Sequence, residues 1–310
     1  MRTVNSSSFL QARSAAGVVC AGLLLWAALA GAGRTSTVLA RAQDPIDKTV
    51  APVYEGFQRN PDGSFDLLFG YFNRNWDDEI DVPVGPDNRL EPGGPDQGQP
   101  AHFLPRRNRF VFRVRVPANF GNNEIVWTLK TKGQTLYAYG TLKPLYEVDD
   151  ISIGANFGGG GGTGFHPDLV GNKAPALEVP GEKGRLARVG EPVTLRAVAT
   201  DDGLPRPRSL RRSIGRDRVT PDSATGLRLS WFVYRGTGDV VFDPPQTKVW
   251  EDLRDGGNSP WSVGWETPPV PPDNTWVTRV TFNKPGRYVL RCLAHDGAAD
   301  THADVTFVVN

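Results

Sequence analysis

The sequence contains very few cysteines. Only Cys20 and Cys292 occur among its 310 residues. Cys20 lies in an N-terminal segment with the pattern of an export signal, so Cys292 would be the sole cysteine of the exported protein. A single thiol excludes an internal disulfide, even in an oxidising compartment. Cys292 also falls on the apolar face of a predicted strand, so we expect a buried, inert thiol rather than a nucleophile.

Recognisable catalytic motifs are also missing. The four histidines, His102, His166, His295 and His302, lack the HExxH spacing of a zinc hydrolase, and no Gly-x-Ser-x-Gly elbow occurs. The glycine run 158–162 is not followed by the Lys-Ser/Thr of a phosphate loop. These absences favour a non-catalytic protein.

Neither sign of charge is in clear excess. Four of the 35 basic residues and none of the 34 acidic residues lie in positions 1–42, so the rest of the chain carries 31 basic against 34 acidic side chains. The resulting net charge of −3 gives no electrostatic reason to expect a nucleic-acid partner.

The first 42 residues have the pattern of a signal peptide. Arg2 and Arg13 are the only charges before an uncharged run over 14–33, and Ala40-Arg41-Ala42 has the small-x-small pattern that signal peptidase recognises. We expect an N-terminal signal helix, cleavage near Ala42, and an extracytoplasmic location in the periplasm, on the cell surface or outside the cell. The alternative is a retained anchor, since the run is near the minimum for crossing a bilayer; the chain would then contact the membrane through this segment only.

Long amphipathic helical patterns are scarce after the signal. With 35 glycines, 26 prolines and only 22% charged residues, the chain is dense in turns, which favours an all-β fold. Residues 158–164 are nearly all glycine and are typical of a flexible linker that forms no core. We predict two antiparallel β-sandwich domains of the immunoglobulin-like type, 43–150 and 174–310, joined by a Gly-rich linker over 151–173.

Alternation of apolar and polar residues predicts the strands of both domains. In the first domain we expect strands over 64–73, 80–84, 109–116, 124–131 and 135–142, the last two forming a hairpin around Lys132-Gly133. The polar segment 85–105 is long for a loop, so we expect it either to function or to pack as a small unit of its own.

In the second domain the expected strands are 193–200, 226–234, 240–242, 277–282, 286–295 and 303–309. The strand 286–295 is the clearest, because Tyr288, Leu290, Cys292 and Ala294 share one face. Arg291 and His295 fall on the opposite face, and we expect His295 to face solvent.

Residues 174–310 resemble an immunoglobulin-like domain of the PKD type. The matching stretches are 190–195, 199–203, 229–231 and 282–297. The resemblance implies that Tyr288 is a corner tyrosine whose hydroxyl bonds back to the backbone. Two long insertions, 204–226 and 243–275, depart from the pattern.

Residues 54–143 are similar to a module of bacterial cell-surface and secreted proteins. The stretches that match are 70–73, 82–88, 96–100 and 125–129. This similarity implies a bacterial extracytoplasmic setting and supplies neither catalytic residues nor a ligand.

Carboxylates in two loops of the second domain are candidate metal ligands. Asp201 and Asp202 end one predicted strand, and Asp296 and Asp300 lie in the loop before the last strand. In a PKD-like topology both loops emerge at the same end of the sandwich, where several carboxylates could coordinate Ca²⁺, the one cofactor considered. The alternative is that each aspartate caps its own turn.

Aromatic residues crowd the insertion 243–275 and its border. Trp250, Trp261, Trp265 and Trp276 would form a stacking platform for glycans if their rings were exposed. The alternative is that the insertion folds back and buries them. The other insertion holds a cluster of arginines that could bind an anionic partner or lie solvated in a loop: Arg206, Arg208, Arg211, Arg212, Arg216 and Arg218.

The sequence thus favours an exported, non-catalytic binding, adhesion or accessory protein of the bacterial envelope, with a glycan or an envelope protein as partner. A hydrolase whose site is assembled across loops, from residues such as Asp201, Asp296 and His295, is the alternative from another class. A purely structural spacer is the third possibility.

Overall fold

The computed structural model describes residues 48–210 and 219–310. Residues from Asp44 to Asn310 belong to one compact unit. The predicted signal peptide lies outside the described residues, and no helix among the described ones is long and apolar enough to cross a membrane.

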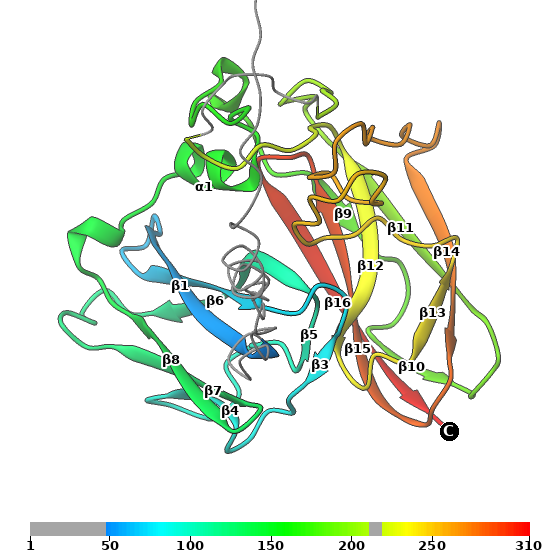
Figure 1. Cartoon of the computed structure of the whole chain (residues 1–310), viewed down its shortest axis with the longest axis horizontal. Coiled ribbons are helices and arrows are strands. Elements are labelled where there is room, and N and C mark those ends of the chain that lie inside the picture. The colour runs from blue at the N-terminus through cyan, green and yellow to red at the C-terminus, as the bar shows by residue number, and fades with distance from the viewer. Residues whose placement is uncertain (1–47, 211–218) are drawn as a thin grey trace, which may run out of the picture. The chain divides into compact units, whose positions relative to one another are not determined.

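The N-terminal half of the described chain is built from small antiparallel sheets, coloured blue to green in Figure 1. One sheet has the order β1-β2-β6 and another β4-β7-β8, while β3 pairs with β5. The strands are β1 (Val50–Arg59), β2 (Phe65–Asn73), β3 (Ile80–Asp81), β4 (Asn88–Glu91), β5 (His102–Phe103), β6 (Arg106–Val116), β7 (Ile125–Thr131) and β8 (Gln134–Gly140).

The two three-stranded sheets share one apolar core. Large side chains from both sheets interlock there, with Trp127 of β7 against Phe69 of β2 and Phe112 of β6 at ring-centroid distances of 6.2 and 5.0 Å. The β7–β8 hairpin turns at Lys132 and Gly133, both with positive φ, as the two-residue hairpin turn requires. The predicted hairpin is therefore confirmed.

The C-terminal half forms two four-stranded sheets within the described residues. Their orders are β13-β14-β11-β9 and β10-β16-β15-β12 (Figure 1). The strands are β9 (Ala176–Glu178), β10 (Gly184–Ala187), β11 (Val193–Thr200), β12 (Arg228–Arg235), β13 (Val240–Asp243), β14 (Thr275–Phe282), β15 (Gly286–His295) and β16 (Asp300–Val309).

This strand order is that of an immunoglobulin-like sandwich. If β9, β11, β12, β13, β14, β15 and β16 are taken as strands A to G, one sheet holds A, B, E and D and the other holds C, F and G. The Tyr288 hydroxyl donates to the Lys284 carbonyl at 2.9 Å, which confirms the corner tyrosine. Trp231 on β12 is buried opposite Cys292. The N-terminal sheets have a different order, so the immunoglobulin-like description applies to the C-terminal sandwich.

The polar segment between β3 and β6 packs as a small ordered unit. It contains two strands that the sequence pattern did not reveal, β4 and β5. Asn88 ties its ends together, because its amide donates to the carbonyls of Val82 and Pro100 and its side-chain oxygen accepts from the Trp127 indole at 3.0 Å. The long loop is thus held to the first core.

The glycine-rich segment is not a flexible linker, which corrects the sequence-based expectation. Residues Asp150–Phe157 form the helix α1, capped at its start by the Asp149 side chain. At its end Gly158 has φ 102°, and its amide donates to Ala155 O and Gly154 O. The backbone of Gly158 lies so close to Ser223 that a Cβ would meet the Ser223 nitrogen at 2.6 Å. Glycine is needed there for close packing rather than for mobility.

The second face of β15 is buried at Arg291 and His295, which corrects the expectation of a solvent-facing His295. Tyr288, Leu290, Cys292 and Ala294 lie in the second core, as predicted. Arg291 and His295 on the other face are each only 5% exposed. They are covered by β6 and α1, because Arg291 donates to the Val111 carbonyl at 2.7 Å and the His295 ring packs edge-on against Phe157 at 4.5 Å.

A bulge in β6 directs Phe110 toward α1, beside the contact with β15. The register between β2 and β6 shifts between Phe69 and Tyr71, and Phe110 has φ 50°. Phe110 consequently leaves the first core and joins Leu68, Ile153 and Phe157 in a small third core. That third core joins the N-terminal sandwich to α1, and the Phe157 ring of α1 contacts His295 of the C-terminal sandwich.

Candidate functional site

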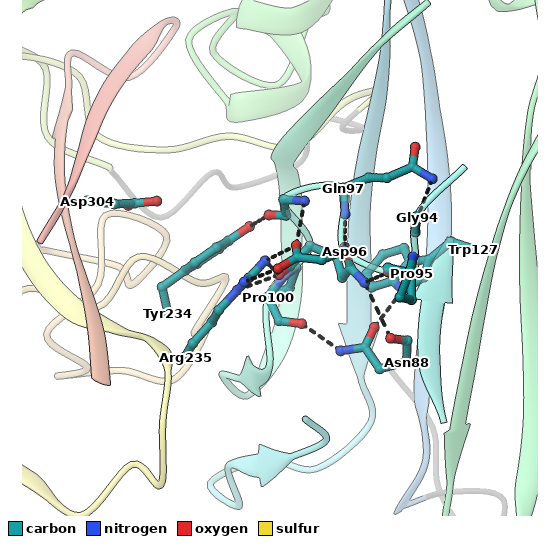
Figure 2. A network of polar contacts seen from close by, with 12 residues as sticks. Asn88, Gly94, Pro95, Asp96, Gln97, Pro100, Trp127, Tyr234, Arg235 and Asp304 are labelled. Atoms are coloured by element: carbon teal, nitrogen blue, oxygen red, sulfur yellow. Dashed lines mark hydrogen bonds and ion pairs between the residues drawn. The ribbon is translucent and has the colours of Figure 1, made fainter. Parts of the chain in front are cut away.

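A polar network joins the segment 94–104 to the strand β12. Figure 2 shows Tyr234 and Arg235 reaching this segment, where the Tyr234 hydroxyl donates to the Gly98 carbonyl and the Arg235 guanidinium pairs with Asp96 at 2.8 and 2.9 Å. The same guanidinium donates to the Gln99 carbonyl at 2.7 Å. The two sandwiches are thereby joined at a second place.

His102 is the charged centre of this second contact. Its Nδ1 lies 2.7 Å from Asp81 and its Nε2 lies 3.0 Å from Glu79. Gly238 covers the ring so closely that a Cβ there would meet His102 Cε1 at 2.5 Å. Burial disfavours the imidazolium, but the hydrogen bonds to Asp81 and Glu79 outweigh it and raise the pKa of His102 to about 9.

We therefore expect the free energy of unfolding to fall as pH rises from 6.5 to 9. The folded pKa lies above the unfolded value of 6.5, so the stabilisation from His102 is complete below about pH 6.5 and is lost as pH passes 9. The loss should be about 3 kcal/mol at most. Urea titrations across this range should show the fall, and His102→Gln should flatten it. An equally steep fall in the variant would rule out His102 as its cause.

The insertion 243–275 is ordered and contacts the N-terminal sandwich. Its organising residue is Asp252, whose buried carboxylate accepts from Lys248 at 2.6 Å and from Arg254 at 2.7 Å. The hydrogen bond from Arg254 is the main reason that the pKa of Asp252 lies far below its usual range. Arg254 also pairs with Asp77 at 2.8 Å, and Glu251 with Arg109 at 3.0 Å, so the insertion is held to both β6 and the end of β2.

An open groove lies where the insertion meets the N-terminal sandwich. We call it the Trp76 groove; it has a volume of about 260 Å³. Its lining residues are Phe72, Trp76, Arg106, Arg107, Arg109, Glu251 and Leu253. The two large apolar side chains Trp76 and Leu253 are 50% and 52% exposed, one contributed by each side of the contact. Exposed aromatic and aliphatic side chains beside arginines are typical of binding surfaces.

Arg106 is the distinctive residue of the Trp76 groove. Its guanidinium carbon lies 3.9 Å from the Trp76 ring centroid and 5.0 Å from that of Phe72. Its backbone has φ 57°, a left-handed conformation that is uncommon outside glycine and tends to occur at functional sites. Among the described residues, no carboxylate forms an ion pair with Arg106. Burial lowers the pKa of Arg106 by more than the nearby carboxylates of Glu251 and Asp252 raise it.

The four aspartates considered as Ca²⁺ ligands are each used in other ways. Asp201 accepts from Gly203 N, and Asp202 accepts from Leu204 N and from Lys173 N. Asp296 accepts from the amides of Ala298 and Ala299 and from the Asn172 side chain. Asp300 lies 3.9 Å from His302.

The loops that hold Asp201 and Asp296 do lie near each other, and Asn172 and Lys173 donate to Asp296 and Asp202 there. Across the described residues, no group of three or more His, Cys, Asp and Glu side chains is placed to hold a metal ion. The arrangement is that of turn capping, which corrects the expectation of a carboxylate cluster.

The four tryptophans do not form an exposed platform, which corrects the second site prediction. Trp261 is only 5% exposed, and Trp276 packs against the second core. Trp250 lies under Lys248, and the Trp265 indole donates to Asn258 at 3.1 Å. Trp261 is thus buried, while Trp250, Trp265 and Trp276 are half-buried and none of the four is fully exposed.

Two residues of the hydrolase alternative, His295 and Asp296, are buried, and Asp201 is half-buried. His295 and His302 line one cavity of about 60 Å³ with Asp300. Burial lowers the pKa of His295 to about 3 and raises that of Asp296 to about 6. His295 Nδ1 accepts from Gly297 N at 2.8 Å, so this lone pair is engaged. Burial also raises the pKa of the free Cys292 thiol well above its ordinary value.

The arginine-rich insertion is only partly described. Arg206 forms a double hydrogen bond with Asp168, and Arg208 binds Asp222 together with the carbonyls of Gly158 and Ser223. These two arginines hold the segment after α1 in place. The other four, Arg211, Arg212, Arg216 and Arg218, lie outside the described residues.

The Trp76 groove was not found from the sequence. One local signal was present: Trp76 is a large aromatic residue within the polar stretch 73–78, directly after β2. The rest of the groove comes from positions 106–109 and 251–253, whose proximity depends on the contact between the two sandwiches.

Comparison with known proteins gives no family. No family model matches the sequence, and no curated protein matches it. Solved structures match at low similarity. The SrpA adhesin from Streptococcus sanguinis is 16% identical with a TM-score of 0.21, over 44% of this chain and 57% of that one.

Two further structures show a comparable level of likeness. The PKD domain of a peptidase from a Thermoplasmatales archaeon is 14% identical over 44% of this chain and 97% of that domain, with a TM-score of 0.21. The Yersinia pseudotuberculosis adhesin InvE is 9% identical over 85% of this chain and 59% of that one, also with a TM-score of 0.21. Such scores carry no functional argument, and the immunoglobulin-like assignment rests on the strand order.

Proposed function

We propose that the protein is an exported, non-catalytic binding protein of the bacterial envelope that holds its ligand in the Trp76 groove. The observation that supports this most is the pair of half-exposed apolar side chains, Trp76 and Leu253, on the two sides of one groove. Single exposed apolar side chains are common, but apolar side chains that lie together in one groove are typical of a binding site. The ordered insertion 243–275, which supplies one wall, favours binding over a spacer role.

Export belongs to the same proposal. The charged start, the uncharged run over 14–33 and the Ala40-Arg41-Ala42 pattern support cleavage after Ala42 and an extracytoplasmic location. N-terminal sequencing of protein recovered from the periplasm or medium of a bacterial host should give Gln43 as the first residue. Recovery of the intact N-terminus in the membrane fraction would instead favour the anchor.

Replacing Trp76 with alanine should weaken ligand binding at least about tenfold, because aromatic residues at the centre of an interface contribute most of its affinity. The ligand would be sought by panning a phage-displayed random peptide library and a glycan array on the exported protein. Affinities of the selected ligands would be measured by calorimetry.

Tyr137→Ala provides the matched control, since Tyr137 is 52% exposed and lies on β8, away from the groove. It should leave the affinity unchanged. Selected ligands that bind the Trp76→Ala variant as tightly as the unaltered protein would contradict the assignment of the groove.

A further inference from the structure

The Trp76 groove contains one arginine that forms no ion pair within the described part of the chain, although Glu251 and Asp252 lie close enough to act on its charge. Arg107 pairs with Glu55 at 2.7 Å, and Arg109 pairs with Glu251 at 3.0 Å. Arg254, whose guanidinium lies 5.8 Å from the Trp76 ring, pairs with Asp77 and Asp252. Only Arg106 among these arginines has no carboxylate partner in the described part of the chain.

The Arg106 guanidinium is also held in place before any ligand arrives. The guanidinium carbon lies 5.0 and 3.9 Å from the ring centroids of Phe72 and Trp76, which restrict where the side chain can move. A planar guanidinium binds a carboxylate through two parallel hydrogen bonds. Because the side chain is already ordered, little conformational entropy is lost on binding. Arg106 is therefore suited to a carboxylate.

The remaining walls of the groove indicate what should adjoin that carboxylate. Leu253 and the exposed half of Trp76 offer apolar surface within the same groove. A sugar ring would need a free aromatic face, but Arg106 already lies over the Trp76 ring. An aliphatic or aromatic side chain can instead contact Leu253 and the exposed edge of Trp76.

From this arrangement we infer that the groove binds a protein segment in which an acidic residue stands next to a large apolar one. The carboxylate pairs with Arg106, and the apolar side chain packs between Trp76 and Leu253. This inference rests on the proposed function, because it names the chemistry of the ligand at the same groove.

The test uses peptides selected from the phage-displayed library on the whole exported protein. We expect the selected sequences to share an Asp or Glu beside Leu, Ile, Phe or Trp. In a synthetic peptide, exchange of the acid for Asn or Gln should weaken binding at least about tenfold, and this requires no change to the protein. Raising the salt concentration should also weaken binding.

In the Arg106→Gln variant, the acidic and the amide peptide should bind with equal affinity. A double-mutant cycle gives this result when two residues pair directly. Arg196→Gln is the control, since Arg196 is an exposed arginine on β11 in the other sandwich. This variant should still bind the acidic peptide more tightly than the amide peptide.

The possible failures can be told apart. In one outcome, peptides lose binding to Trp76→Ala and yet bind the unaltered protein equally well with the acid or with its amide. That result would overturn the inference and leave the proposed function standing. Selection of glycans alone, with loss of binding in Trp76→Ala, would do the same. Ligands that bind independently of Trp76 would overturn both.

Discussion

Arg291→Ala should lower the free energy of unfolding by about 3 kcal/mol, because it removes a buried side chain that packs on Tyr234 and leaves the Val111 carbonyl without its donor. Arg291 pairs with Asp304 at 2.8 and 2.9 Å and lies 3.5 Å from the Tyr234 ring centroid. It also donates to the Val111 carbonyl of the N-terminal sandwich. The variant should therefore separate the unfolding of the two sandwiches, and calorimetry should show two transitions where the unaltered protein shows one.

Arg287→Ala is the control for this experiment, since Arg287 lies on the same strand and is exposed. It should change the stability by no more than about 0.5 kcal/mol. If Arg291→Ala behaved like the control, the contact between β15 and β6 would not join the two sandwiches.

Gly158→Ala should destabilise the protein by about 3 kcal/mol, measured by urea denaturation. The left-handed backbone of Gly158, with φ 102°, disfavours alanine by about 1–2 kcal/mol. The new Cβ would also meet Ser223 at 2.5–2.7 Å, so the backbone after α1 would have to shift.

Gly171→Ala separates the effect of a positive φ from the effect of the steric contact with Ser223. Gly171 also has a positive φ, of 82°, but a Cβ there would meet nothing within 4 Å. In this variant the free energy of unfolding should fall by only about 1 kcal/mol. Equal and small losses for the two variants would mean that the glycine-rich segment is not packed against the C-terminal sandwich.

Most strands of both cores were predictable because they show local alternation, whereas β1, β9 and β10 were not predicted. The pattern over 109–116 and 286–295 identifies one apolar face of each strand, and the structure places that face in a core, with the exception of Phe110. The turn at Lys132-Gly133 was also predictable, because its positive φ values depend on these two residues alone.

The second face of β15 was not predictable in the same way. Alternation shows that Arg291 and His295 share a face, but it does not reveal whether another part of the chain covers that face. Burial of a charged residue needs a specific partner, and Asp304 and Val111 are supplied by different sandwiches. The face with Arg291 and His295 was therefore expected to be exposed to solvent.

The glycine-rich segment was misread because composition does not distinguish a flexible glycine from a closely packed one. Gly158 and Gly159 lie close to Ser223 and Gly297, where a side chain would not fit. The helix α1 was missed for a related reason, since its eight residues are too few for a clear period.

The candidate site was the least predictable part of the molecule. The tryptophans of the insertion are close in sequence, yet Trp261 is buried and the other three are half-buried. The groove residues Trp76, Arg106 and Leu253 come from three separate segments. The pairing of β2 with β6 brings Trp76 to Arg106, and the contact between the insertion and the N-terminal sandwich adds Leu253.

Amide hydrogen exchange over residues 154–164 tests most directly whether the two sandwiches and the segment between them form one folded unit. The amides of Gly159 and Gly161 donate to Gly154 O and Gly158 O at 2.9 and 3.2 Å. They should be protected, and the Gly159 amide should exchange with a free energy close to that of global unfolding. Exchange of this segment at the rate of an unstructured peptide would contradict the ordered junction, and with it the groove that the junction positions.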